Sequence, residues 1–228
     1  MSTRRSSPTP GLLLVSKRPD DFGFRYNTVL WSLVQHASFS PAGSRAVGPR
    51  FVSFAAVFYG LLTVAGAVWC GLRGIELPVF GPNPATGLAF GAATAAGTVS
   101  LSLLAYRLVP ITRKLADELA PSLVDRADRT GLVLVALFSG IGEEVFFRGA
   151  VQQEFGLLIA SLAFGLAHVG PDRRYLLWTA WAVLAGVVFG LLFGATGGLL
   201  APVAAHVLHN AATLLIWKRS RPNLPTGT

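Results

Sequence analysis

The chain has little cysteine and little charge. Cys70 is its one cysteine among 228 residues, so neither a disulfide framework nor a thiolate metal site can form within a single chain. Charged residues make up 13% of the sequence, whereas about 25% is usual in soluble domains. We expect no cleavable signal peptide, because the apolar run at residues 12–15 is too short for one. These shortages exclude a disulfide-rich scaffold and argue against a soluble domain.

Hydrophobic residues, by contrast, are abundant. They make up 52% of the sequence, and the mean hydropathy is +0.56, which predicts a multi-pass protein of the cell membrane. The formal net charge of +8 could indicate nucleic acid, but the basic residues lie in the tails and in short loops between apolar runs. Anionic lipid headgroups attract basic residues at such positions. We therefore expect the lipid bilayer, and not nucleic acid, as their partner.

The apolar segments predict an all-α fold, a polytopic transmembrane helical bundle with about six spans and additional interfacial helices. The expected spans cover about residues 51–72, 86–106, 131 to a turn at Gly156, 157–169, 176–193 and 198–217. Residues 107–130 are polar, with Ile111, Leu115 and Leu119 at intervals of four, and predict a helix at the membrane surface. A second surface helix is expected at residues 27–37, although an ordinary exposed segment explains these residues equally well.

The distribution of basic residues predicts the orientation. Seven Lys or Arg residues precede the first span, five lie in residues 107–130, two in 171–174 and three in 218–228. The loops between these positions hold Arg73 at most. By the positive-inside rule both termini are cytoplasmic. We thus expect a basic cytoplasmic tail at 1–50, a transmembrane domain at 51–217 and a second basic cytoplasmic tail at 218–228.

Two adjacent acids, Glu143 and Glu144, interrupt the third apolar run. A carboxylate at the bilayer centre costs roughly 2.5–3.5 kcal/mol on insertion scales, so intramembrane acids are usually paired and functional. Arg148 follows Glu144 by four residues, where an ion pair can form on one helix face. A purely structural role for Glu144 and Arg148 explains this pair as well as a catalytic role does.

Three further polar residues lie in the later spans. Glu143 precedes Gly156 by 13 residues and His168 follows it by 12, so a helical hairpin at Gly156 places the carboxylate and the imidazole face to face. His206 and Asn210 are four residues apart and share a helix face. A straight fifth helix leaves His206 roughly 15 Å from the level of His168, unless part of the preceding loop follows the membrane surface.

Two hydrolytic mechanisms fit this set. His168, His206 and Glu143 can hold Zn²⁺ with water at the open position, and the neighbouring carboxylate then serves as general base. Without metal, one buried glutamate activates the water, while a histidine and Asn210 stabilise the oxyanion. The residues alone do not decide between the two.

Two other classes of protein remain open on the same residues. A non-catalytic membrane protein, resembling a bacteriocin-immunity or scaffold factor, would use the polar set only for structure. An ion or proton transporter would also place glutamate and histidine inside the membrane. His168 near a helix end and His209 beside the site also have simple interfacial or packing explanations.

The order of these residues resembles that of a known family. Glu143-Glu144-Val-Phe-Phe-Arg148 fits EExxxR, Phe164-Gly-Leu-Ala-His168 fits FxxxH, and His206-Val-Leu-His-Asn210 fits HxxxN. These motifs, which cover about residues 131–217, are similar to those of the CPBP family of intramembrane proteases, which includes the type II CAAX prenyl endopeptidases and the Abi proteins.

The resemblance implies a membrane endopeptidase whose catalytic cavity opens to the cytoplasm and whose substrate is a membrane-associated protein or peptide. It implies Glu143 as the water-activating carboxylate, His168, His206 and Asn210 as its partners, and Glu144 and Arg148 as close support. Because members have been described both as zinc-dependent and as metal-free, the resemblance leaves Zn²⁺ conditional.

Overall fold

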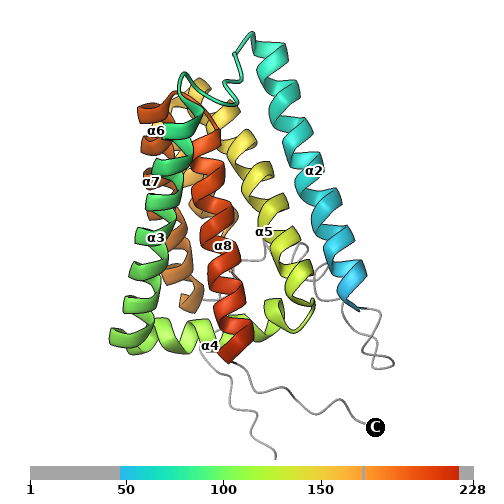
Figure 1. Ribbon diagram of the computed structural model, residues 1–228, viewed down its shortest axis with the longest axis vertical. Coiled ribbons are helices and arrows are strands. Elements are labelled where there is room, and N and C mark those ends of the chain that lie inside the picture. The colour runs from blue at the N-terminus through green and yellow to red at the C-terminus, as the bar shows by residue number, and fades with distance from the viewer. Residues whose placement is uncertain (1–46, 171–172, 221–228) are drawn as a thin grey trace, which may run out of the picture.

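A computed structural model of the protein describes residues 47–170 and 173–220, and every regular element in these two ranges is a helix (Figure 1). The first two spans are α2 (Val47–Arg73) and α3 (Pro84–Leu108). Large apolar side chains on α2, such as Leu61 and Leu72, are exposed, as expected for a surface that faces lipid.

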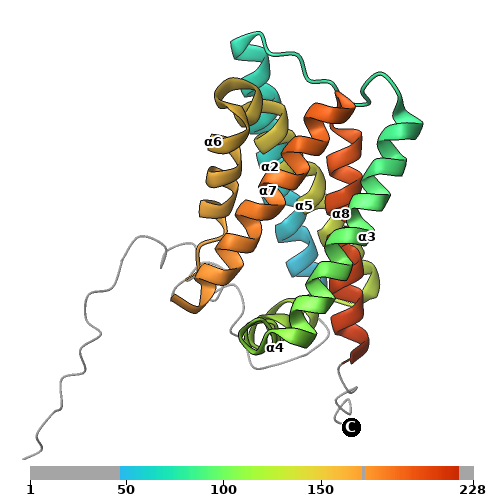
Figure 2. The ribbon, with the colours of Figure 1, turned by 90° about the vertical axis from the view of Figure 1, so that its left-hand side faces the viewer.

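The short helix α4 (Pro110–Val124) lies across one end of the bundle, roughly perpendicular to the spans (Figures 1 and 2). Its Leu115 is buried, whereas Ile111 is exposed. Lys218 at the end of the last helix donates a hydrogen bond to the carbonyl of Val124, which ties α4 to the bundle. This arrangement agrees with the prediction of a surface helix within residues 107–130.

The acid pair ends α5 (Arg129–Glu144). Asp128 caps the start of this helix by accepting a hydrogen bond from the amide of Gly131 at 2.7 Å. A π-helix, η1 (Val145–Val151), follows directly and carries Arg148. Such wider turns inside helices are frequent at functional sites.

The chain then turns back at Gly156, within α6 (Gln152–Ala167). Gly156 has φ +86° and ψ 168°, a backbone conformation that essentially only glycine adopts. Phe147 before this turn contacts Phe164 after it, with ring centroids 5.1 Å apart, which confirms the predicted hairpin. The arm after Gly156 is shorter than the roughly 20 residues that a membrane-crossing helix needs.

The last two spans are α7 (Leu176–Thr196), preceded by the 3₁₀ turn η2 (Arg173–Tyr175), and α8 (Leu200–Ser220). Gly186 on α7 approaches the backbone of α6 so closely that an added Cβ would lie 3.0 Å from the Cα of Ser161. This close contact holds α7 against the hairpin.

Among the described residues, five helices are long and apolar enough to cross a membrane, including the stretch Arg129–Ala167, which contains the turn at Gly156. The protein is therefore a multi-pass membrane protein with the all-helical fold that we predicted. The third and fourth predicted spans form this one stretch, whose two arms run in opposite directions about the turn at Gly156. The tails at 1–46 and 221–228, including the helix predicted at 27–37, lie outside the described residues.

Candidate active site

Glu143 and Glu144 lie on the last turn of α5, inside the bundle. Their relative exposures are 8% and 0%, and that of Arg148 is 1%. Three ionisable side chains are thus buried within one membrane-spanning stretch. Each needs a polar partner, because an isolated buried charge is very costly.

One oxygen of Glu144 holds two of these partners. Its Oε1 accepts a hydrogen bond from Nη1 of Arg148 at 3.1 Å and lies 2.7 Å from Nδ1 of His206. Nη2 of Arg148 also donates to the carbonyl of Gly186 at 3.1 Å. Glu144 and Arg148 together therefore join α5, η1, α7 and α8, and the ion pair expected from the EExxxR spacing is present.

Glu143 faces the other nitrogen of the same imidazole. Its Oε2 lies 3.7 Å from Nε2 of His206. The hydroxyl of Tyr59, on α2, lies beside the Glu143 side chain. Helices α2 and α5 are close at this point, since a Cβ added at Gly142 would lie 2.7 Å from the carbonyl oxygen of Tyr59. The Glu143 carboxylate is thus held between α2 and α8.

Asn210 lies one turn beyond His206 on α8. Its side-chain amide donates to Oγ of Ser139 at 3.2 Å, and Ser139 donates to the carbonyl of Ala136 at 3.2 Å. The neighbouring His209 forms a different bond, from its Nδ1 to Oγ1 of Thr98 at 2.9 Å. His209 thus links α8 to α3, as its structural interpretation predicts.

Aromatic rings enclose the buried charges. The guanidinium carbon of Arg148 lies 4.6 Å from the ring centroid of Phe164 and 5.7 Å from that of Phe189. The His206 ring lies 5.2 Å from Phe189 and 6.0 Å from Phe164. These rings keep the dielectric around the carboxylates low, which strengthens their interaction with Arg148.

His168 stands apart from the other site residues. It ends α6 in a non-helical conformation (φ −102°, ψ 12°), and its Nδ1 lies 2.7 Å from the carbonyl oxygen of Phe164. Its ring packs on Phe164 at 4.6 Å and near Trp178 at 6.2 Å. In the described part of the chain no hydrogen bond or ion pair between His168 and Glu143 is found. Phe164 packs beside the His168 ring and contacts Phe147 on the other arm of the hairpin.

The proposed zinc ligands fit a metal only in part. A carbonyl oxygen only accepts, so Nδ1 of His168 carries hydrogen, and in the neutral ring Nε2 keeps a lone pair. Glu144 anchors Nδ1 of His206 in a similar way, and such anchoring is common in metal-binding histidines. Within the described ranges, however, no group of three His, Cys, Asp or Glu side chains is close enough to hold an ion. As placed, His168, His206 and Glu143 do not form a complete zinc site.

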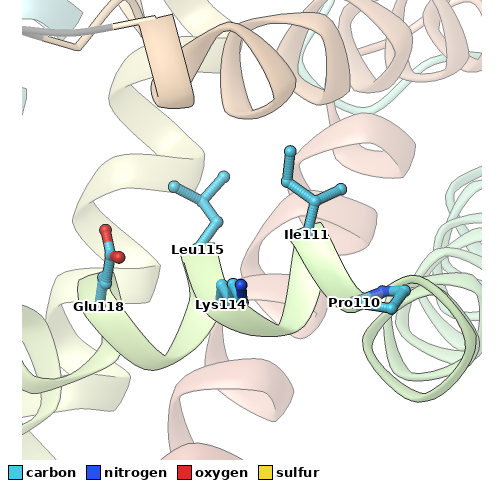
Figure 3. Close-up of a pocket in the computed structure, with 5 residues that line it drawn as sticks. All are labelled: Pro110, Ile111, Lys114, Leu115 and Glu118. Carbon is cyan, nitrogen blue, oxygen red and sulfur yellow. The ribbon is translucent and has the colours of Figure 1, made fainter.

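A separate pocket lies over α4. Its volume is about 360 Å³, and its described lining consists of five residues of α4: Pro110, Ile111, Lys114, Leu115 and Glu118. Ile111 and Leu115 point from α4 into this space (Figure 3). None of the candidate site residues lines it, so this pocket is distinct from the buried acid cluster.

Sequence reasoning missed Tyr59 and Ser139. Tyr59 lies in the first span, far from the three motifs, and no spacing rule connects it to Glu143. Ser139 precedes Glu143 by four residues and so shares its helix face. That spacing could have identified Ser139, because Asn210 has the same spacing from His206 on the facing helix.

Comparisons with known proteins agree with the motifs. Residues 127–212 match the family model described as type II CAAX prenyl endopeptidase Rce1-like. A curated relative, uncharacterized protein YpbD of Bacillus subtilis (strain 168), is 34% identical over 83 residues. The aligned stretch covers 35% of this chain and 42% of that relative, so the chain spans less than half the length of the relative. No solved structure matched the chain.

Proposed function

We propose that the chain is an intramembrane endopeptidase of the CPBP family in which Glu143 activates water, a proposal that rests on the match of residues 127–212 to the Rce1-like family model. The observation that carries the proposal is the buried contact set around His206. One imidazole lies between two carboxylates, 2.7 Å from Glu144 and 3.7 Å from Glu143. Such a cluster inside a membrane has a high energetic cost, and proton transfer is a use that explains it.

Glu143 is the proposed general base. Oε1 of Glu144 is occupied by Arg148 and His206, and its Oε2 is buried without a partner among the described residues. Glu143 is the more exposed of the two, with 8% of its surface accessible against 0% for Glu144. Glu143 is therefore the carboxylate that a water molecule can reach. It takes a proton from that water as the oxygen attacks the carbonyl carbon of the peptide bond.

Asn210 and the protonated form of His206, which donates from both ring nitrogens, are the proposed partners of the developing oxyanion. Glu144 fixes the orientation of the His206 ring, so that Nε2 points toward Glu143. The Asn210 amide lies one helical turn away on the same face of α8. When the tetrahedral intermediate collapses, the C–N bond breaks and the proton held by Glu143 passes to the leaving amine. His168 is proposed as a further partner of the site, and no proton-transfer step is assigned to it.

The proposed orientation places both termini in the cytoplasm. The first residue of α2, the last residue of α8 and the surface helix α4 lie at the same end of the bundle (Figure 1). Because basic residues gather at this end, the positive-inside rule assigns it to the cytoplasm. We propose that the substrate is a membrane-associated protein or peptide that reaches the site from this side.

A comparison of two strains tests this function without a known substrate. One strain expresses the wild-type protein, and the other expresses Glu143→Gln at the same level. New protein N-termini are then compared in their membrane fractions. The proposal predicts peptides whose cleavage requires Glu143. Identical sets of N-termini in the two strains would favour the non-catalytic scaffold instead. Ion flux across vesicles that hold the purified protein would favour the transporter.

A further inference from the structure

Helices α5 and α8 present four polar residues to each other in two matching pairs. Ser139 and Glu143 are four residues apart on α5, and His206 and Asn210 are four apart on α8. The helices run in opposite directions (Figure 1). Ser139 therefore meets Asn210 at 3.2 Å, one turn from the level at which Glu143 meets His206 at 3.7 Å.

The two helices are close enough here to fix these pairs firmly. Between the two levels, a Cβ added at Gly140 would lie 3.1 Å from the backbone nitrogen of Val207. Ser139 is buried, with 5% of its surface exposed. The hydroxyl is therefore confined between the helices, and water cannot easily replace it as the partner of Asn210.

The hydroxyl of Ser139 can act toward Asn210 only as an acceptor. Its one hydrogen is donated to the carbonyl of Ala136 at 3.2 Å. A carbonyl oxygen accepts and never donates, so this assignment leaves only lone pairs of Oγ for Asn210. The Asn210 side chain must then turn its NH₂ group, and not its oxygen, toward α5.

We propose that Ser139 is a positioning residue that sets the orientation of the Asn210 amide, an inference that rests on the proposed hydrolytic function. One N–H of Asn210 binds Ser139, and the second N–H stays on the same nitrogen, available to the oxyanion. Without the Ser139 acceptor the amide can rotate by half a turn and present its oxygen, which repels a developing negative charge. Ser139 touches neither substrate nor water and acts through Asn210.

The test is a kinetic comparison of Ser139→Ala, Asn210→Ala and the double variant, on a peptide whose cleavage requires Glu143. Removal of a whole oxyanion donor lowers kcat by about 10²–10³. We expect Ser139→Ala to lower kcat about tenfold, because the donor remains but is misoriented. KM should change little. In the Asn210→Ala background Ser139→Ala should have no further effect, since its target is absent.

Two further variants separate positioning from structure. Ser161→Ala is a matched control, because Ser161 is also buried and its hydroxyl also donates to its own helix, to the carbonyl of Leu157. It should keep wild-type kcat. Ser139→Thr keeps the hydroxyl and should restore most of the activity. If Ser139→Ala does not fold, Ser139→Cys makes the same comparison with a weak acceptor of similar size.

Two results would overturn the inference while leaving the proposed function intact. One is wild-type kcat in Ser139→Ala while Glu143→Gln is inactive. The other is an equal loss from Ser139→Ala with and without Asn210. Wild-type cleavage by Glu143→Gln would instead refute the proposed function itself.

Discussion

Nδ1 of His206 lies 2.7 Å from Oε1 of Glu144, and both side chains are buried. The same oxygen binds Arg148 at 3.1 Å. Glu144, the second residue of the acid pair, thus contacts both the guanidinium of Arg148 and the imidazole of His206. In the proposed mechanism this arrangement gives each of the two adjacent acids its own role, since Glu144 orients His206 and Glu143 activates water.

Glu144→Gln should lower both stability and activity. The substitution leaves the buried guanidinium of Arg148 without its nearest carboxylate, and breaking a buried ion pair in this way costs about 3–5 kcal/mol. The measurements are the free energy of unfolding in detergent and the cleavage rate. Adding Arg148→Met should recover much of the stability but not the activity, because His206 still lacks its carboxylate. Full activity in the double variant would contradict the role of Glu144 toward His206.

Tyr59→Phe should slow cleavage without unfolding the protein. The change removes the hydroxyl that lies beside Glu143 and keeps the ring that packs at 5.1 Å from Phe58. We expect kcat to fall about threefold to tenfold, in line with the loss of a polar interaction of about 1 kcal/mol. Phe58→Leu, on the neighbouring exposed position of α2, is the control and should cleave at the wild-type rate. An unchanged kcat in Tyr59→Phe would remove α2 from the site.

Gly156→Ala should destabilise the protein through its backbone alone. Nothing lies within 4 Å of an added Cβ at this position, but φ is +86°, and such a conformation costs a non-glycine residue about 1–3 kcal/mol. Gly97→Ala on α3 is the matched control, with the same open space and no positive φ. It should be neutral or stabilising by about 0.5–1 kcal/mol. Equal unfolding midpoints for the two variants would show that alanine adopts the backbone conformation of Gly156 without strain.

Chelation should leave the activity unchanged. The donors that the zinc hypothesis requires do not form a group of three in the described ranges, and the proposed steps use only side chains and water. The measurement is the cleavage rate before and after treatment with a strong chelator, together with the metal content of the purified protein. Loss of activity on chelation that added Zn²⁺ restores would contradict this prediction. It would require His168 to move toward His206 to complete the set of ligands.

Much of the fold could be predicted from local patterns. The apolar runs identify the helices, Gly156 identifies the hairpin, and the spacing of Glu144 and Arg148 identifies their ion pair. Each of these features depends on residues that are near in sequence. For the same reason the common face of His206 and Asn210 followed directly from their spacing.

The register between distant helices was harder to predict. Sequence geometry favoured His168 as the close partner of Glu143 and left His206 at an uncertain depth, whereas the structure places His206 against both acids. The depth of α8 depends on the tilt of α7 and on the loop before it, which no local pattern determines. Tyr59 was missed because its position depends on how α2 packs against α5.

The most direct test is the cleavage rate of purified protein in liposomes, with Glu143→Gln compared to the wild type on a peptide selected from the strain comparison. Glu154→Gln is the matched control, because Glu154 lies in the same stretch but pairs with Arg73. The account predicts that Glu143→Gln loses at least about 10²-fold in rate, while Glu154→Gln and the wild type cleave alike. Equal cleavage by Glu143→Gln and the wild type would contradict it.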